Sequence, residues 1–168
     1  MSRIFIFIVF IFCSIIVAAQ SNYEIVTDSA SGSKIMLGQC KKIDFENELC
    51  SGWFYEEFNN YHPDSATVAL LKEHIPASGI IFLGTWCSDS RREVPRFFKI
   101  VELAGWCPDN FEVYCLDHKK MLSGIDVASY KIELVPTFIF YDGDTELGRI
   151  IETPQTSIEG DLLKIISN

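Results

Sequence analysis

Cys87 is the side chain whose neighbours in the sequence most clearly indicate chemistry. It follows an apolar, β-prone run at residues 80–83 and a Gly-Thr turn, and it precedes an apolar stripe with helical spacing at residues 94–101. A thiol in the first turn of a helix lies near unpaired backbone N–H groups and the positive end of the helix dipole, which favour the thiolate. Arg91 and Arg92 add positive charge beside it. Because the thiolate is the form that attacks disulfides, the pattern predicts a reactive cysteine.

A buried structural cysteine is the alternative interpretation, since a free cysteine often behaves as a small apolar residue. The position of Trp86 and Cys87 at a strand-to-helix junction favours the reactive interpretation. Residues 88–90, which are Ser, Asp and Ser, are the candidate N-cap residues of the helix. We expect this helix to end by Gly105.

The segment Gly84-Thr85-Trp86-Cys87, followed two residues later by Ser90-Arg91-Arg92-Glu93-Val94-Pro95, resembles the active-site segment of thioredoxin-fold proteins. It is most similar to the TlpA/ResA-like thiol:disulfide oxidoreductases of the cell envelope, and the resemblance extends over about residues 65–168. It implies an α/β fold, the thioredoxin-like sandwich, in which helices flank a mixed central sheet. The chain departs from the family where Ser90 replaces the second cysteine of the Cys-x-x-Cys motif.

Ser90 implies a mechanism with a single active-site thiol. In a dithiol enzyme the second cysteine expels the first from the mixed disulfide, and a serine cannot take that step. Its hydroxyl can donate a hydrogen bond that stabilises the Cys87 thiolate. We therefore expect Cys87 to act on protein disulfides or low-molecular-weight thiols and disulfides. Release then needs an external thiol or a substrate cysteine, as in a monothiol reductase or a disulfide isomerase.

The resemblance also suggests roles for residues outside the Cys-x-x-Ser motif. Glu93 stands where the envelope branch carries an acid, so it is a candidate proton acceptor; the alternative is a surface carboxylate that pairs with Arg92 or Arg96. Residues 135–137, Val-Pro-Thr, look like the family's cis-proline loop, which lies against the catalytic sulfur and pairs with an extended substrate peptide. The residues implied for substrate binding are Trp86, Val135 and Pro136.

The three histidines, His62, His74 and His118, lie in no metal-ligand spacing, so we expect no metal and no cofactor. His118 follows a predicted strand, where a place near the active-site edge is one interpretation and a solvated loop histidine is the favoured one. The formal net charge is −9 at pH 7. Such an acidic chain lacks the basic surface that nucleic-acid binding needs.

Residues 1–19 have the three parts of a secretory signal peptide. Arg3 gives a basic start, residues 4–17 form an apolar run shorter than the roughly 20 residues of a membrane-spanning helix, and small residues precede a cleavage point near Ala19. We expect a periplasmic or secreted protein. The alternative is an uncleaved N-terminal anchor, the one case in which we expect membrane attachment.

Five cysteines follow residue 19, and an odd number leaves at least one thiol unpaired within the monomer. Local disulfides between Cys40 and Cys50, or between Cys107 and Cys115, are both open. Cys87 is the obvious candidate for the unpaired thiol. A helix of about 15 residues is roughly 22 Å long, so we expect Cys107 to lie too far from Cys87 to resolve a disulfide there.

The patterns predict an N-terminal extension at residues 20–64 and a thioredoxin-like domain at residues 65–168. Their order predicts a mixed sheet with helices on both faces. We expect Trp53 and Phe54 in the extension to pack against this sheet rather than to form a ligand-stacking site. The expected elements are a flexible lead at 20–33, strands at 34–41, 80–83, 111–116, 137–141 and 146–152, a helix or irregular arm at 44–63, and helices at 66–74, 90–105, 121–130 and 158–166.

These features leave two hypotheses for function. The first is monothiol thiol-disulfide exchange through Cys87. The second is a non-catalytic module that keeps the fold and holds peptides, or serves a structural role, through Trp86 and the proline loop.

Overall fold

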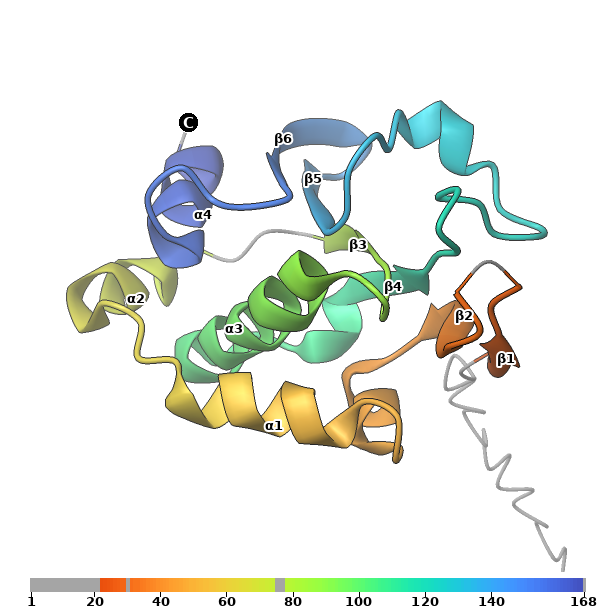
Figure 1. Ribbon diagram of the computed structural model, residues 1–168. Coiled ribbons are helices and arrows are strands. Elements are labelled where there is room, and N and C mark those ends of the chain that lie inside the picture. Colours follow the sequence, from red (N-terminus) through yellow and green to blue (C-terminus); the bar gives the residue numbers. More distant parts are fainter. Residues whose placement is uncertain (1–21, 30, 75–77, 168) are drawn as a thin grey trace, which may run out of the picture.

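A six-stranded mixed sheet forms the centre of the structure, a computed structural model that describes residues 22–29, 31–74 and 78–167 (Figure 1). The strands lie in the order β1-β2-β4-β3-β5-β6. β3 is parallel to β4, and all other neighbours are antiparallel. The predicted signal peptide lies outside the described residues. The strands are β1 Asn22–Thr27, β2 Lys34–Cys40, β3 Ser78–Leu83, β4 Phe111–Cys115, β5 Thr137–Asp142 and β6 Thr145–Ile151.

Helices connect the strands, so the chain has an α/β fold, as the order of the predicted elements indicated. The longest helix, α3, begins two residues before its predicted start and ends where Gly105 adopts the left-handed conformation, with φ +75°. The α-helices are α1 Ser51–Asn60, α2 Ser65–Leu71, α3 Ser88–Ala104 and α4 Ile158–Ile166, and the 3-10 helices are η1 Lys42–Glu46, η2 Pro108–Asn110 and η3 Val127–Tyr130.

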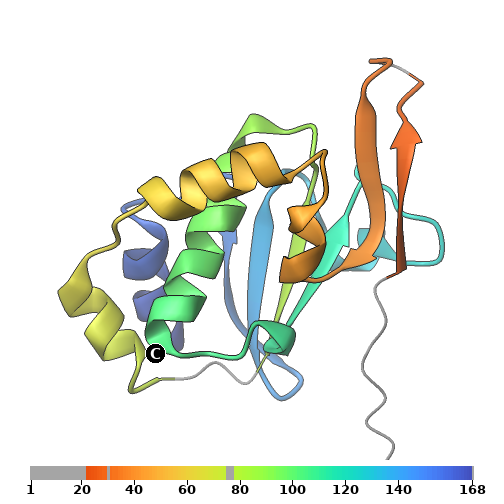
Figure 2. The ribbon, with the colours of Figure 1, turned by 90° about the horizontal axis from the view of Figure 1, so that it is seen from below.

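All four α-helices lie on one face of the sheet, with α3 in contact with α1, α2 and α4 (Figure 2). The expectation of helices on both faces is therefore wrong. The opposite face is covered by residues 116–136, in which η3 is the one helical turn.

The helix predicted at residues 121–130 is reduced to this single 3-10 turn, Val127–Tyr130. Gly124 adopts φ +83°, a conformation that interrupts a right-handed helix. Asp126 then caps the short turn, because its side chain accepts a hydrogen bond from the Ser129 N–H. The turn-forming residues that we expected to cap a helix here instead leave only this short turn.

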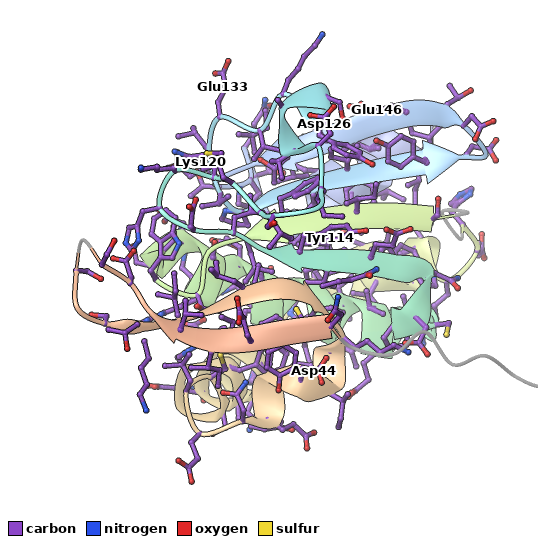
Figure 3. The ribbon with its side chains drawn as sticks, turned by 90° about the vertical axis from the view of Figure 1, so that its right-hand side faces the viewer. Asp44, Tyr114, Lys120, Asp126, Glu133 and Glu146 are labelled. Atoms are coloured by element: carbon purple, nitrogen blue, oxygen red, sulfur yellow. The ribbon has the colours of Figure 1, made fainter. Side chains whose placement is uncertain are left out.

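Residues 116–136 cover a second, smaller hydrophobic cluster. Figure 3 shows Lys120, Asp126 and Glu133 on this segment, above Tyr114 of β4. Its charged side chains are exposed or half-buried, whereas Leu116, Val127 and Val135 are buried in the cluster. Met121 and Leu134 of the same segment are exposed. The buried residues of the cluster are Phe82, Tyr114, Leu116, Val127, Val135 and Ile139.

The first strand corrects a second expectation, since residues 22–27 are not a flexible lead but strand β1, paired along its whole length with β2. The two strands are joined by a turn in which the Asp28 carboxylate accepts hydrogen bonds from Ser31 and Gly32 adopts φ +70°. The Tyr-Glu-Ile-Val-Thr sequence of β1 has strand-forming residues. The polar residues of the turn after it led us to expect a flexible lead and not a hairpin.

The aromatic residues of the extension pack into the main core, as expected. Phe54 of α1 is buried and stacks on Phe45 at 5.2 Å between ring centroids, and it also contacts Phe98 of α3. Residues 34–60 thus share one hydrophobic core with the helices and strands that follow them. This core lies on the helical face of the sheet.

The last helix is fixed to the α1–α2 connection by a buried acid. Glu159 at the start of α4 is 4% exposed, and its carboxylate accepts hydrogen bonds from the Tyr61 hydroxyl at 2.6 Å and the Asp64 N–H at 3.1 Å. Burial, and then the Glu159 carboxylate, raise the pKa of Tyr61, so its phenol remains a donor.

Within the described residues, no helix is both long enough and apolar enough to cross a bilayer.

Candidate functional site

Cys87 occupies the N-cap position of α3, directly after the turn that follows β3. Its backbone is extended, its N–H donates to the Gly84 carbonyl, and its own carbonyl accepts the first bond of the helix, from Arg91 N. The residues predicted as N-caps, 88–90, are instead the first helical residues, because the chain turns into the helix one step earlier. The Cys87 side chain is partly exposed.

The Cys87 sulfur faces the predicted proline loop. The thiol donates a hydrogen bond to the Val135 carbonyl oxygen, with 3.2 Å between sulfur and oxygen. The Val135–Pro136 peptide bond is cis, as the resemblance implied. The two segments meet because β5 is antiparallel to β3, so the start of β5 at Thr137 lies beside Phe82 at the end of β3.

Ser90 is completely buried, and its hydroxyl does not have the hydrogen-bond partner that we expected, the Cys87 sulfur. Its hydroxyl oxygen accepts a hydrogen bond from the Gly84 N–H at 3.2 Å. Among the described residues, no hydrogen bond joins Ser90 to the Cys87 sulfur. Ser90 therefore braces the turn that carries Trp86 and Cys87.

Glu93 is a buried carboxylate, 3% exposed, rather than a surface one. It accepts a hydrogen bond from Arg92 Nε at 2.6 Å and lies 3.8 Å from the Arg96 guanidinium. Arg92 also pairs with Asp89 at 2.7 Å. The pairing with Arg92 and Arg96 that we considered as the alternative is present, and no hydrogen bond or ion pair of the described residues joins Glu93 to Cys87.

Trp86 is held on two sides. Its indole N–H donates to the Leu116 carbonyl at 3.0 Å, and its ring stacks on the His118 imidazole, with centroids 4.1 Å apart and planes 20° apart. His118 in turn lies with Nδ1 3.4 Å from the Asp28 carboxylate of the β1–β2 turn. The favoured interpretation of His118 as a solvated loop residue is therefore wrong. The sequence analysis missed this cluster because Asp28 lies in the turn of the β1–β2 hairpin, which was not predicted.

Arg91 contacts the turn before Cys87 and the ring of Trp53. Its Nε donates to the Thr85 carbonyl at 2.6 Å, and its guanidinium carbon lies 6.0 Å from the Trp53 ring centroid. Thr85 is also buried, and its hydroxyl accepts a hydrogen bond from the Met36 N–H at 3.0 Å. The turn before Cys87 is thus fixed to both α3 and β2.

The other four described cysteines form neither of the two disulfides that the spacing left open. Cys40 and Cys115 are neighbours instead, with 3.4 Å between their sulfur atoms. The Cys50 thiol donates to the Met36 sulfur at 3.3 Å. Cys107 is exposed beyond the far end of α3, which separates it from Cys87 as expected.

A metal ion has no ready site in the part of the chain that the structure describes. Across residues 22–29, 31–74 and 78–167, the His, Cys, Asp and Glu side chains form no group of three that could hold one.

No family model matches the chain, and a search of curated proteins finds no significant match. Solved structures with a similar fold include a protein of unknown function, PA1234, from Pseudomonas aeruginosa and an HIV epitope scaffold. Each is 18% identical to this chain with a TM-score of 0.51. The alignments cover 76% of this chain and 91% and 92% of the two others. At this identity the similarity concerns the α/β fold alone.

Proposed function

We propose that the chain has a thioredoxin-like fold and carries out monothiol thiol-disulfide exchange through Cys87. The observation that carries the proposal is the position of the Cys87 sulfur. It is partly exposed at the N-terminus of α3 and lies 3.2 Å from the Val135 oxygen in the proline loop. A sulfur in this place can be reached by a disulfide and lies beside backbone groups that can bind an extended peptide.

The proposed reaction has two exchange steps. The Cys87 thiolate attacks one sulfur of a disulfide, forms a mixed disulfide with it, and expels the other sulfur as a thiolate, which takes a proton from solvent. An external thiolate then attacks the mixed disulfide and returns Cys87 to its thiolate form. The substrate sulfur leaves in a new disulfide with the external thiol, so the enzyme is neither oxidised nor reduced over the cycle.

Ser90 supports the need for an external thiol. It occupies the position of a resolving cysteine, carries oxygen in place of sulfur and is fully buried. Cys107, the other described cysteine with clear exposure, lies beyond α3. We infer that a mixed disulfide on Cys87 persists until a small thiol or a substrate cysteine releases it.

The proposed substrate is a protein disulfide or a low-molecular-weight disulfide. Trp86 and the Val135–Pro136 segment flank the Cys87 sulfur, and Leu134 beside them is 41% exposed, so an apolar peptide segment can pack there. Such disulfides persist in oxidising compartments, which agrees with the predicted export to the periplasm or beyond.

Glu93 fits a positioning role better than that of a proton acceptor. Its carboxylate oxygen Oε1 already pairs with Arg92 and Arg96. A Glu93→Gln variant tests this. If Glu93 accepts the proton, the pH profile of exchange shifts; if it fixes α3, the melting temperature falls and the profile keeps its shape.

The test of function is an exchange assay with glutathione and a small disulfide, repeated with insulin. Cys87→Ser should abolish activity, whereas the matched variant Cys107→Ser, which removes an exposed thiol away from the proline loop, should retain it. Equal activity of Cys87→Ser and the wild type would overturn the proposal. Peptide binding that survives Cys87→Ser without any exchange activity would favour the non-catalytic module.

A further inference from the structure

Two buried cysteines on neighbouring strands lie close enough to react with each other. Cys40 is the last residue of β2 and Cys115 the last of β4, and their sulfur atoms are 3.4 Å apart. Cys40 is 2% and Cys115 0% exposed. A disulfide needs about 2.0 Å between sulfurs, so each sulfur has to move by less than about 1 Å.

The strand register explains why these two side chains meet. The residue paired directly with Cys115 is Gly38, which has no side chain, while Cys40 is paired with Val113. Cys40 and Cys115 lie on the same buried face of the sheet, one pair apart in the register, and Gly38 places no side chain between them. Among the described residues, Cys40 is the cysteine in contact with Cys115.

The geometry points to a disulfide between Cys40 and Cys115 that forms when the chain meets small-molecule disulfides such as glutathione disulfide. The Cys40 thiolate attacks glutathione disulfide and releases one glutathione, and the Cys115 thiolate then attacks the sulfur of Cys40 and releases the second. The two protons that Cys40 and Cys115 lose pass through solvent to the two glutathione thiolates. The two cysteine sulfurs are oxidised, and glutathione disulfide is reduced to two thiols. The inference does not rest on the exchange activity of Cys87.

The other thiols have different surroundings. Cys50 is buried and donates to the sulfur of Met36, and Cys87 donates to the Val135 carbonyl. Cys107 is exposed beyond α3. In the described part of the chain no hydrogen bond joins any of these three to another cysteine sulfur, although Cys50 lies near enough to Cys40 and Cys115 for charge on one to affect another. Cys40–Cys115 is thus the pair that the fold brings together.

The burial of both thiols determines when the Cys40–Cys115 disulfide can form. The hydrogen bond with Cys115, and then burial, raise the pKa of Cys40, so its reactive thiolate is scarce in the folded protein. The disulfide should therefore form while β2 is still docking onto β4, or after local opening. Once closed, it ties two strands 75 residues apart in the chain and fixes the β1–β2 hairpin to the sheet.

The test is to unfold the full chain, refold it in a glutathione redox buffer, block remaining thiols and digest it with trypsin and an enzyme that cleaves after glutamate. The cuts after Lys34, Lys41, Glu112 and Lys119 place Cys40 in peptide 35–41 and Cys115 in peptide 113–119, apart from every other cysteine. We expect these two peptides joined, with two hydrogens lost, and the joined species gone after reduction. Wild type, Cys87→Ser and Cys107→Ser should all give it.

The stability readout is independent of peptide mapping. Reduction should lower the melting temperature of the refolded wild type and leave that of the double variant Cys40→Ala, Cys115→Ala unchanged. The inference would be overturned if, after refolding, peptides 35–41 and 113–119 each carried a blocking group of their own. Cys40 joined to the peptide that contains Cys50 would overturn it as well. Loss of exchange activity in Cys87→Ser changes neither the peptide map nor the melting temperatures, so each of the two proposals can fail without the other.

Discussion

At the scale of single residues, the proposed chemistry depends on one sulfur and one oxygen. The Cys87 sulfur is accessible beside the proline loop, while the Ser90 oxygen is buried and occupied by the Gly84 N–H. Position 90 thus lacks the second sulfur of the Cys-x-x-Cys motif that this segment resembles. Restoring that sulfur should change how the mixed disulfide is released.

We predict that Ser90→Cys releases the mixed disulfide without an external thiol, because the new thiol completes a Cys-x-x-Cys motif with Cys87 and a second thiol of such a motif can expel the first. The measurement is the lifetime of a Cys87–glutathione adduct by intact mass after excess glutathione is removed. Ser88→Cys, which adds a thiol at an exposed position in the same turn, is the matched control and should leave the lifetime unchanged. Equal lifetimes for Ser90→Cys and wild type would show that position 90 cannot reach the sulfur of Cys87.

A second prediction concerns pH and stability. Burial raises the pKa of Cys50 to about 12, whereas a thiol in the unfolded chain ionises near ~8.5. Between these values the unfolded state loses a proton that the folded state keeps. The stability that this thiol contributes is therefore complete below pH ~8.5 and is lost as pH rises toward 12.

Urea unfolding in reducing buffer measures this effect. The free energy of unfolding should fall with rising pH, and Cys50→Ala should make the slope shallower by up to about 1.4 kcal/mol per pH unit, the value for one proton. Cys107→Ala removes an exposed thiol and should leave the slope as it is. Parallel slopes for wild type and Cys50→Ala would contradict the assignment.

Several residue placements could be predicted from the sequence because they depend on neighbours in the chain. Cys87 at the start of a helix is an example. The cis bond before Pro136 was implied by the resemblance alone, since a trans bond is the default for a proline. The partners of Ser90 and Arg91 could not, because each bonds to backbone atoms whose positions the turn at residues 84–86 decides. The contact of Cys40 with Cys115 depends on the β2–β4 register, which no local pattern specifies.

At the scale of elements, the β1–β2 hairpin is a support for the candidate site. Its turn places Asp28 beside His118, which stacks on Trp86, and β2 supplies the Met36 N–H to Thr85. The N-terminal extension thus holds Thr85 directly and Trp86 through His118, and both residues belong to the turn at 84–86. Since the hairpin was missed in the sequence, this dependence was missed with it.

We predict that His118→Ala slows exchange by roughly fivefold, because loss of a stacked aromatic partner worth about 1 kcal/mol lets Trp86 move beside Cys87. The measurements are exchange rate and the change in tryptophan emission. His74→Ala is the control, since His74 is exposed at the end of α2. An unchanged rate and emission in His118→Ala would remove the cluster from the account of the site.

At the scale of the whole molecule, the α/β class and most elements followed from apolar spacing, because each strand or helix has to bury one face. The arrangement of layers did not follow. Residues 116–136 cover β3, β4 and β5 on the second face of the sheet with little helix, which depends on how turn residues pack against these strands. The aromatic residues of the extension pack into the main core, as expected, and its strands β1 and β2 also continue the main sheet.

We therefore predict that a fragment of residues 65–168 does not fold cooperatively. It lacks β1, β2 and α1, so Phe98 of α3 and Cys115 of β4 lose the residues that bury them. Thermal unfolding followed by circular dichroism should show a broad transition for the fragment and a sharp one for the full chain. A sharp transition at a similar temperature would mean that the extension is dispensable for stability.

The most direct test of the central proposal is the identity of the thiol that forms a mixed disulfide. In a Cys107→Ser background, brief treatment of the folded protein with glutathione disulfide should add one glutathione. Peptide mapping should place it on Cys87, and it should stay until an external thiol is added. An unmodified Cys87, in protein shown to be folded, would contradict the account.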